Sequence, residues 1–424
     1  MEFALALFLV TYVLLLIFAK YRALIALSSA LIFIVSGILP VTTALKAVNF
    51  NVILMLAGTM GIVALFIESK MPALLADLLL KRVPNVKWAI VILAMFAGII
   101  SAFVDNVATV LMVAPVALTI SKKLNISPVP GLIAISISSN LQGAATLVGD
   151  ATAIMMGSHA DMTFFDFFVY QGKASIFWAV QAGAVAFGLV CLLIFRKYSQ
   201  PLSEEVRKNK TVVTDYVPTI LLVGMIVLLI LFSFIENTPE LTNGYICFGL
   251  FIIGLIITFF RKRDKRILVD TFKEIDITTL LLLTGLFIVV AGITEAGVID
   301  KIGKLFVQFS GDNLFVLYTF VVWISVVFSA FIDNIPYVAT MLPVISSIAA
   351  TIGVNPTVLY FGLLSGATLG GNITPIGASA NITAIGILRK NGYEVKLGQY
   401  LKISIPATLS AVTVGYLLIW LIWR

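Results

Sequence analysis

The sequence predicts an all-α polytopic membrane protein made of two inverted repeats, each with about five spans and a re-entrant hairpin, with broken helices at the bilayer midplane. Three observations predict this fold. The 424 residues are 60% hydrophobic and only 12% charged, with a mean hydropathy of +1.10. Basic residues lie at the ends of the apolar runs, and the two halves share one pattern of interruptions. Because an ordinary soluble domain carries about 25% charged residues, the composition excludes a soluble protein.

The net charge of +7 indicates how the chain is oriented in the membrane, and it does not indicate a polyanionic partner. Lysines and arginines flank apolar runs, as at Lys20 and Arg22 and at Lys122 and Lys123. Such residues mark the cytoplasmic ends of spans. We therefore predict a multi-pass protein of the cytoplasmic membrane, in contact with the lipid bilayer and with no nucleic-acid partner. One histidine and two cysteines inside apolar runs offer no metal site or disulfide framework, so we predict no cofactor.

The first repeat is predicted to cover residues 1–195. Its opening spans cross in, out and in: residues 4–18, 23–39 and 52–66. The first of these lacks a basic start and a small-residue cleavage site, which favours a span over a signal peptide. Residues 71–80 are predicted to form an amphipathic helix at the inner interface. Residues 88–120 have basic residues at both flanks and an interruption at Asp105-Asn106, which predicts a re-entrant hairpin. The broken span 130–158 then crosses outward, and residues 174–195 return.

Residues 196–216 are predicted to be a charged cytoplasmic linker between the repeats. The second repeat then covers residues 217–424. Its hairpin, residues 314–352, is interrupted at Asp333-Asn334 and has no basic far flank, so we expect it to enter from outside. Its broken span is residues 355–388. The remaining spans are residues 217–235, 244–260, 277–293 and 403–423, with a basic cluster at 261–266.

An internal repeat supports this arrangement independently of the charges. Setting Asp333 against Asp105 gives an offset of 228, and 15 of the 57 positions from Ser101 to Gly157 are then identical without a gap. An offset of 227 further upstream aligns Gly58 with Gly285. Since each half has an odd number of spans, the second copy must be upside down. Inverted repeats with helices broken at matching positions are typical of alternating-access transporters.

Four helix breaks, two in each half, are expected to converge at one site. Backbone inside a bilayer must satisfy its own hydrogen bonds, so a break persists only where it lines a cavity or binds something. Half-helix ends there offer N–H groups to anions and C=O groups to cations. We predict that the following residues bind substrate and ion: Asp105, Asn106, Asn140, Gly143, Thr146, Gly149, Asp150, Asp333, Asn334, Gly371, Asn372, Thr374 and Gly377.

Oxygen atoms at these breaks suit a sodium ion. Glycines allow the backbone to approach a ligand closely. Backbone carbonyls could then form a hard-oxygen cage with the side chains of Asn106, Thr146, Asn334 and Thr374, which are the candidate sodium ligands.

Asp105, Asp150 and Asp333 are the most informative of these residues. An intramembrane carboxylate costs about 2.5–3.5 kcal/mol on insertion scales and is a functional-site hypothesis by default. Each could exchange a proton, or stay ionised beside a bound cation, which would couple transport to protons or sodium. Two alternatives stay open. Asp105 and Asp333 could cap the half-helices that follow them, and Asp150 could lie near water.

At these motifs the chain resembles the ion transporter superfamily, in particular the branch with arsenite permeases, D-type bacterial sodium/proton antiporters and the melanosomal P protein. Divalent-anion/sodium symporters are more distant relatives. The most specific segments are residues 333–343 and 370–381. The resemblance implies that these segments bind substrate and coupling ion, with Thr340 and Asn381 among the binding residues. It also implies a homodimer with a scaffold part and a moving part, working by an elevator-like motion.

The sequence departs from the superfamily pattern after Gly149-Asp150, where Ala151-Thr152-Ala153 replaces the usual Pro-Pro-Asn. The two half-sites are therefore unequal. No arginine or lysine lies at the breaks in sequence, so an anionic cargo would depend on helix dipoles and bound cations. We expect a secondary active transporter, not an enzyme, that moves a small inorganic or organic ion. Arsenite- or antimonite-type efflux coupled to protons or sodium is the leading hypothesis.

Other functions remain alternatives. A sodium/proton antiporter would use the same carboxylates, and a sodium-coupled anion or dicarboxylate symporter would use the same breaks. A passive channel predicts flux that is insensitive to imposed proton or sodium gradients. An intramembrane aspartyl protease needs two aspartates in their own distinct contexts, whereas here both lie in a repeated Ser-Ala-Phe-x-Asp-Asn motif.

Overall fold

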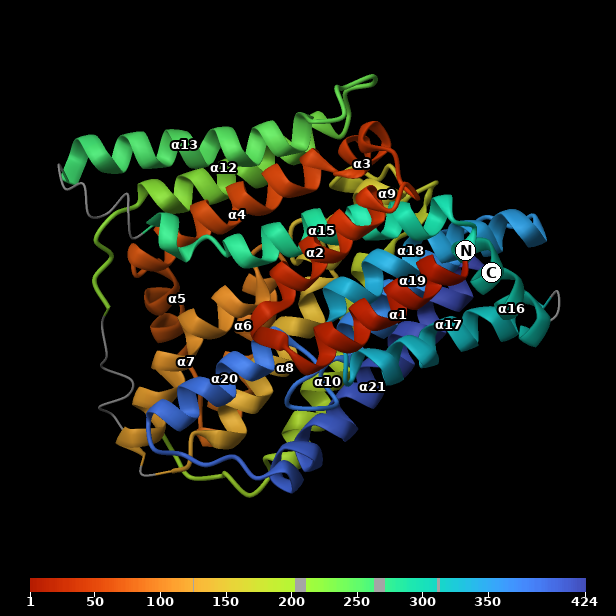
Figure 1. Ribbon diagram of the computed structural model, residues 1–424. Coiled ribbons are helices and arrows are strands. Elements are labelled where there is room, and N and C mark those ends of the chain that lie inside the picture. The colour runs from red at the N-terminus through yellow and green to blue at the C-terminus, as the bar shows by residue number, and fades with distance from the viewer. Residues whose placement is uncertain (125, 203–210, 263–270, 311–312) are drawn as a thin grey trace.

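The computed structural model describes residues 1–124, 126–202, 211–262, 271–310 and 313–424, which are almost entirely helical (Figure 1). Two short strands, β1 (Val169–Tyr170) and β2 (Lys173–Ala174), pair antiparallel. Residues 203–210 of the expected linker and residues 263–266 of the expected basic cluster lie outside the described residues.

The helices of the first half follow one another with short connections. They are α1 (Glu2–Ile17), the 3₁₀ turn η1 (Ala19–Tyr21), α2 (Arg22–Val35), α3 (Val41–Ala47), α4 (Phe50–Glu68), α5 (Met71–Leu80), α6 (Val86–Ser101), α7 (Asn106–Lys123), α8 (Val129–Gly143), α9 (Ala151–His159), the 3₁₀ turn η2 (Phe165–Phe167) and α10 (Ile176–Ile194). The second half contains α12 (Val217–Phe232), α13 (Thr242–Lys262), α15 (Ile277–Glu295), α16 (Val298–Ser310), α17 (Leu314–Ser329), α18 (Asn334–Ile352), α19 (Thr357–Gly370), α20 (Ser379–Lys390) and α21 (Leu397–Trp423).

Six described helices are long and apolar enough to cross a bilayer, judged by length and composition: α4, α10, α13, α15, α18 and α21. Several others are apolar but shorter, among them α1, α2 and α12. The second span is shorter than the predicted 23–39 because α2 ends at Val35. Gly37 follows with a left-handed φ of 74°, and Pro40 precedes α3. Glycine in this conformation followed by proline is a common way to end a helix.

Equivalent helices of the two halves pack in equivalent ways, which confirms the predicted inverted-repeat fold. Helix α4 packs along α13, and α15 packs along α2 (Figure 1). The glycines matched at offset 227 make both contacts. A Cβ on Gly58 would lie 2.3 Å from the carbonyl carbon of Cys247, and one on Gly285 would lie 2.7 Å from that of Ala26. Any side chain at either position would separate the two helices.

Residues matched at offset 228 meet each other at the centre of the molecule. The Nδ2 group of Asn140 on α8 donates to the carbonyl of Thr368 on α19 at 2.6 Å. A Cβ on Gly183 of α10 would lie 2.9 Å from the carbonyl oxygen of Ala411 on α21. Two equivalent residues can touch only close to the axis that relates the halves. The broken spans and the pair α10–α21 therefore lie along that pseudo-two-fold axis.

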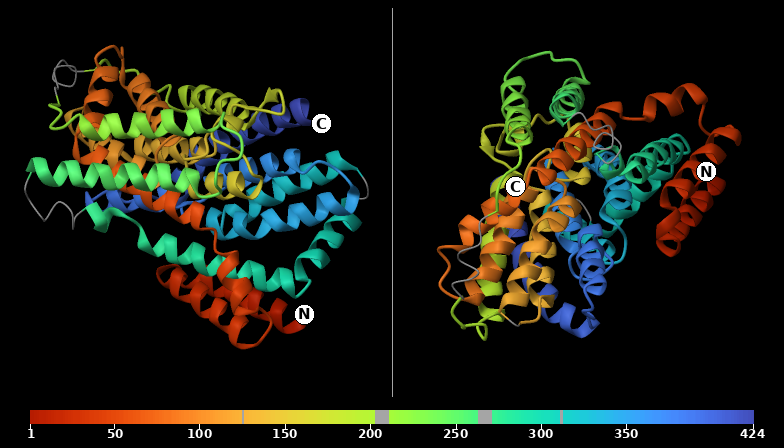
Figure 2. Two further views of the ribbon diagram at one scale, coloured as in Figure 1. Left: turned by 90° about the horizontal axis from the view of Figure 1, so that it is seen from above. Right: turned by 90° about the vertical axis from the view of Figure 1, so that its left-hand side faces the viewer.

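The α1–α2 hairpin lies at one edge of the molecule, against α15 (Figure 2). Helix α5 forms over the residues predicted for an amphipathic helix and packs against α7. Helix α16 packs against α18 in the corresponding way.

Candidate functional site

Each re-entrant hairpin turns at an aspartate that begins the next helix. Between α6 and α7, Oδ1 of Asp105 accepts hydrogen bonds from the N–H groups of Val107 and Ala108 at 3.0 and 3.2 Å. Between α17 and α18, Oδ1 of Asp333 accepts from the N–H of Ile335 at 3.2 Å. Both aspartates are N-caps, which satisfy first-turn donors that have no partner within the helix.

The broken spans restart differently in the two halves. Asp150 caps α9, and its Oδ1 accepts from the N–H of Ala153 at 2.8 Å and from the hydroxyl of Thr152 at 2.6 Å. The residue matched to Asp150 in the second half is Ala378, which precedes α20 and provides no side-chain cap. Asp150 is only 5% exposed, so it does not lie on an open surface.

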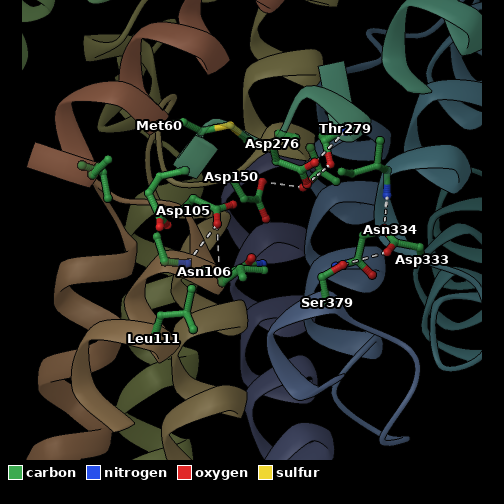
Figure 3. A pocket seen from close by; sticks show the side chains of 18 of the residues that line it. Met60, Asp105, Asn106, Leu111, Asp150, Asp276, Thr279, Asp333, Asn334 and Ser379 are labelled. Carbon is green, nitrogen blue, oxygen red and sulfur yellow. Dashed lines mark hydrogen bonds between the residues drawn. The ribbon is translucent and has the colours of Figure 1, made fainter. Parts of the chain in front are cut away.

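These helix starts surround one pocket with a volume of about 140 Å³. Asp105 and Asp150 lie on one side of it, and Asp333, Asn334 and Ser379 lie on the other (Figure 3). The residues therefore come from the first turns of α7, α9, α18 and α20. Helix α4 and the start of α15 complete the wall.

Behind the pocket, side-chain amides connect the two hairpin tips. Nδ2 of Asn106 donates to Oδ1 of Asn140 at 2.8 Å, and Nδ2 of Asn334 donates to the same oxygen at 3.4 Å. Nδ2 of Asn140 in turn donates to Oδ1 of Asn372 at 3.2 Å. Among the described residues, Nδ2 of Asn372 has no partner. Asn140 therefore lies between the half-sites instead of at the pocket wall.

Carbonyl oxygens crowd around a glycine in the first broken span. The hydroxyl of Thr146 donates to the carbonyl of Ala102 at the end of the α6 arm. A Cβ on Gly149 would lie 2.3 Å from the carbonyl oxygen of Gly143 and 3.1 Å from that of Ala102. We call the carbonyls of Ala102 and Gly143, together with Thr146, the first cradle.

The second broken span repeats this arrangement. The hydroxyl of Thr374 donates to the carbonyl of Ala330. A Cβ on Gly377 would lie 2.6 Å from the carbonyl oxygens of Gly371 and Ser329, and 2.7 Å from that of Ala330. We call these three carbonyls, together with Thr374, the second cradle. Glycine at both positions lets the backbone segments approach closely, and carbonyl oxygens are the kind of ligand that a hard cation prefers.

Two residues implied by the resemblance lie outside the pocket wall. The hydroxyl of Thr340 donates to the carbonyl of Pro336 at 3.2 Å and is hydrogen-bonded to the hydroxyl of Tyr12 on α1. Asn381 is fully buried, and its Nδ2 donates to the carbonyls of Gly371 and Thr374 at 3.1 and 3.3 Å. Asn381 therefore supports the second cradle, whereas Thr340 is part of a contact with the N-terminal hairpin.

The start of α15 contributes pocket residues that sequence reasoning missed: Glu274, Asp276 and Thr279. Asp276 caps α15, accepting from the N–H of Thr279 at 3.0 Å and from its hydroxyl at 2.6 Å. The repeat contained a signal for it, because the offset of 227 pairs Asp276 with Asn49. Asn49 caps α4 in the same way, through the N–H of Val52 at 3.1 Å.

The expectation that no basic residue reaches the breaks is wrong. Nη1 of Arg22, at the start of α2, lies 2.7 Å from Oδ2 of Asp333, and the two side chains are 20% and 10% exposed. Sequence spacing gives no sign of this ion pair because its members are 311 positions apart. In the sequence, Arg22 marks only the cytoplasmic end of a span.

The sequence of the chain is similar to those of a known family and of several known proteins. Residues 12–366 match the sequence model of the CitMHS family, described as citrate transporter. The uncharacterized transporter Rv2684 of Mycobacterium tuberculosis strain H37Rv is 30% identical over 434 residues, covering 99% of this chain and 97% of that protein. The human P protein is 25% identical over 454 residues, covering 89% of this chain and 54% of that protein.

Two solved transporters share the fold. MtrF of Neisseria gonorrhoeae, reported as illuminating a class of antimetabolite efflux pumps, superposes with a TM-score of 0.59 at 17% identity, covering 89% of this chain and 82% of MtrF. The Alcanivorax borkumensis YdaH transporter, reported to have an unusual topology, superposes with a TM-score of 0.59 at 13% identity, covering 94% of this chain and 96% of YdaH. At these identities the likeness concerns the fold alone.

Proposed function

The chain belongs to the CitMHS citrate transporter family, and on this basis we propose that it is a secondary active transporter for a small ion or oxyacid, coupled to protons or sodium. Alternating access of the pocket between the hairpin tips would move the cargo. We propose the cytoplasmic membrane as its location. The relative Rv2684 is named as a transporter, which supports transport over the protease alternative.

One observation carries the proposal. Three aspartates begin three different half-helices around a single pocket, with a carbonyl cradle in each half. Each capping aspartate could release or take up a proton, or pair with a cation, without unfolding the helix that it caps. Coupling at such a place is direct, because the same half-helix ends would contact the cargo.

The charges of the pocket bear on the cargo. Five carboxylates line it: Asp105, Asp150, Glu274, Asp276 and Asp333. Among the described residues of the wall there is no arginine or lysine, and Arg22 already pairs with Asp333. Such a wall favours a neutral or cationic cargo over a free polycarboxylate. An arsenite-type oxyacid, which is uncharged at neutral pH, is therefore the first cargo we propose.

Two observations support other cargoes. The two cradles offer oxygen atoms to sodium, which supports a sodium/proton antiporter as second candidate. The family's description as citrate transporter supports an anion or dicarboxylate symporter. For such an anion, bound cations or protons would first have to neutralise the carboxylates, and the four half-helix N-termini would then attract it.

The predicted orientation bears on the state of the transporter. The pocket lies near the end of α4 and the start of α15. With the basic segments inside, both of these ends face the cytoplasm. This supports an inward-facing state.

Flux in proteoliposomes tests the proposal. The purified protein would be reconstituted, proton or sodium gradients would be imposed, and uptake of arsenite, citrate, a dicarboxylate or sodium would be measured in separate vesicles. We expect one cargo to accumulate against its own gradient, and accumulation to stop when an ionophore removes the driving gradient. Downhill flux that ignores both imposed gradients would contradict the proposal and favour a channel.

A further inference from the structure

The three aspartates that begin half-helices at the pocket differ in how many hydrogen-bond donors they already have. Oδ1 of Asp333 accepts from the N–H of Ile335, while its Oδ2 accepts from Nη1 of Arg22 at 2.7 Å and from the hydroxyl of Ser379 at 3.0 Å. A guanidinium is charged at every pH that a protein meets. Asp333 is therefore paired with a permanent positive charge, and both of its oxygens accept hydrogen bonds.

Asp105 and Asp150 each keep one oxygen without a described donor. The hydrogen bonds to Asp105 all end on Oδ1, and so do those to Asp150. Within the described residues, no lysine or arginine forms an ion pair with either carboxylate. Both residues line the pocket. Their Oδ2 atoms are thus available to a proton, a cation or the cargo.

The other two acidic residues of the pocket differ from this pair. Asp276 is exposed and accepts from Thr279 on both of its oxygens. Glu274 is exposed beside it, before α15 begins. Water screens the charges of exposed side chains, so neither residue is an unpaired buried group. That leaves Asp105, which is partly buried, and Asp150, which is buried, as the pocket carboxylates with an oxygen that has no described donor.

A second contact ties the N-terminal hairpin to the same re-entrant hairpin. Tyr12 on α1 hydrogen-bonds through its hydroxyl to the carbonyl of Pro336 and to the hydroxyl of Thr340, in the first two turns of α18. Arg22 at the start of α2 binds the cap of that helix. The α1–α2 hairpin therefore holds the start of α18 at two points. The described residues show no matching ion pair between the equivalent hairpin, α12–α13, and Asp105.

We propose that Arg22 is a positioning residue that pairs with Asp333 and holds it fixed, so that the coupling proton or sodium ion is exchanged at Asp105 and Asp150. This inference rests on the proposed coupled transport. Asp105 and Asp333 are matched by the repeat, yet Arg22 makes their roles different. One hairpin tip carries the coupling ion, and the other is held in place by an ion pair.

Removing both members of the ion pair between Arg22 and Asp333 shows whether Asp333 has a positioning role or exchanges the coupling ion. Arg22→Gln leaves Asp333 unpaired, and Asp333→Asn leaves Arg22 unpaired, so each should lower gradient-driven uptake at least about tenfold. The double variant Arg22→Gln/Asp333→Asn leaves neither charge behind, and it should recover uptake to within about threefold of the native protein. Arg22→Lys preserves the charge and should recover most of the uptake. Lys20→Gln, an exposed basic residue two positions earlier, is the matched control.

Each variant would be checked for a single size-exclusion peak and for its melting temperature before flux is measured. A double variant that folds but remains as inactive as the single variants would show that Asp333 itself exchanges the coupling ion, and would overturn the inference. Native rates in Arg22→Gln would overturn it as well. If the double variant does not fold, the charge-swapped variant Arg22→Asp/Asp333→Arg would be tested instead. Recovered uptake would then support the inference, and a folded but inactive protein would overturn it. Failure of the native protein to couple flux to any gradient would instead refute the proposed function.

Discussion

Asp105 shows how one residue can cap a helix and remain available for chemistry. Its Oδ1 receives two backbone N–H groups, and its Oδ2 receives no described donor. The sequence leaves capping and coupling as alternatives, and the geometry makes them compatible because each uses a different oxygen. Asp150 divides its two oxygens in the same way.

The substitution Asp105→Asn separates the two roles. Asparagine is as good an N-cap as aspartate, so the free energy of unfolding should change by less than about 1 kcal/mol. The amide cannot exchange a proton or balance a cation, and gradient-driven uptake should fall to the level of empty vesicles. Melting temperature and uptake would be measured on the same preparation. Glu236→Gln, at an exposed loop carboxylate that is not part of the pocket lining, should change neither quantity.

A clear loss of stability in Asp105→Asn together with normal uptake would contradict this assignment. The aspartate would then be a cap whose charge supports folding and takes no part in transport.

At the scale of the elements, each of the two cradles requires a glycine in the broken span, because carbonyl oxygens surround that position. The space at Gly377 is closed, because a Cβ would lie 2.6 Å from two carbonyl oxygens. By contrast, a Cβ on Gly249 in α13 would meet nothing within 4 Å. The first position is determined by the carbonyls that surround it, and the second is an ordinary helical glycine.

Gly377→Ala should therefore be costly and Gly249→Ala should not. Forcing a methyl group among carbonyls is expected to lower the free energy of unfolding by about 1–3 kcal/mol. Alanine in the middle of α13 should be neutral or stabilising by up to about 1 kcal/mol. If the second cradle binds sodium, adding sodium should raise the melting temperature of the native protein and of Gly249→Ala, but not that of Gly377→Ala.

An equal sodium-dependent shift in all three proteins would place sodium binding away from the second cradle. No shift in any of them would favour protons as the coupling ion.

Features that occur in both copies of the repeat could be predicted from the sequence, and contacts that occur in only one copy could not. The register that aligns Asp105 with Asp333 also aligns the cradle glycines and threonines, because the same local turn is needed in each copy. Arg22 cannot be found in this way, since its contact with Asp333 joins α2 to a hairpin 311 residues later. Asp276 was missed because its match, Asn49, is not acidic, although both residues cap their helices. Contacts that differ between the copies are those that the repeat cannot reveal.

For the molecule as a whole, the composition and the repeat predict the fold class, whereas the basic residues alone predict its orientation in the membrane. The contacts between Asn140 and Thr368 and between Gly183 and Ala411 identify the axis relating the halves. The homodimer implied by the resemblance also remains a prediction.

Cysteine labelling tests the orientation. Asp161 and Arg389 are exposed residues related by the offset of 228, beyond the end of α9 and near the end of α20. In an inverted repeat they must lie on opposite sides of the membrane. The native thiols of Cys191 and Cys247 are buried. In intact cells, a membrane-impermeant thiol reagent should label Asp161→Cys, and it should label Arg389→Cys only after the membrane is permeabilised. Labelling of both from the same side would contradict the inverted topology.

If cargo and coupling ion share one pocket, each must be able to drive the other. In proteoliposomes without any imposed ion gradient, a gradient of the cargo alone should drive proton or sodium movement across the membrane, and Asp105→Asn or Asp150→Asn should abolish that movement. Cargo that flows down its gradient in the native protein while neither protons nor sodium move would contradict a shared pocket.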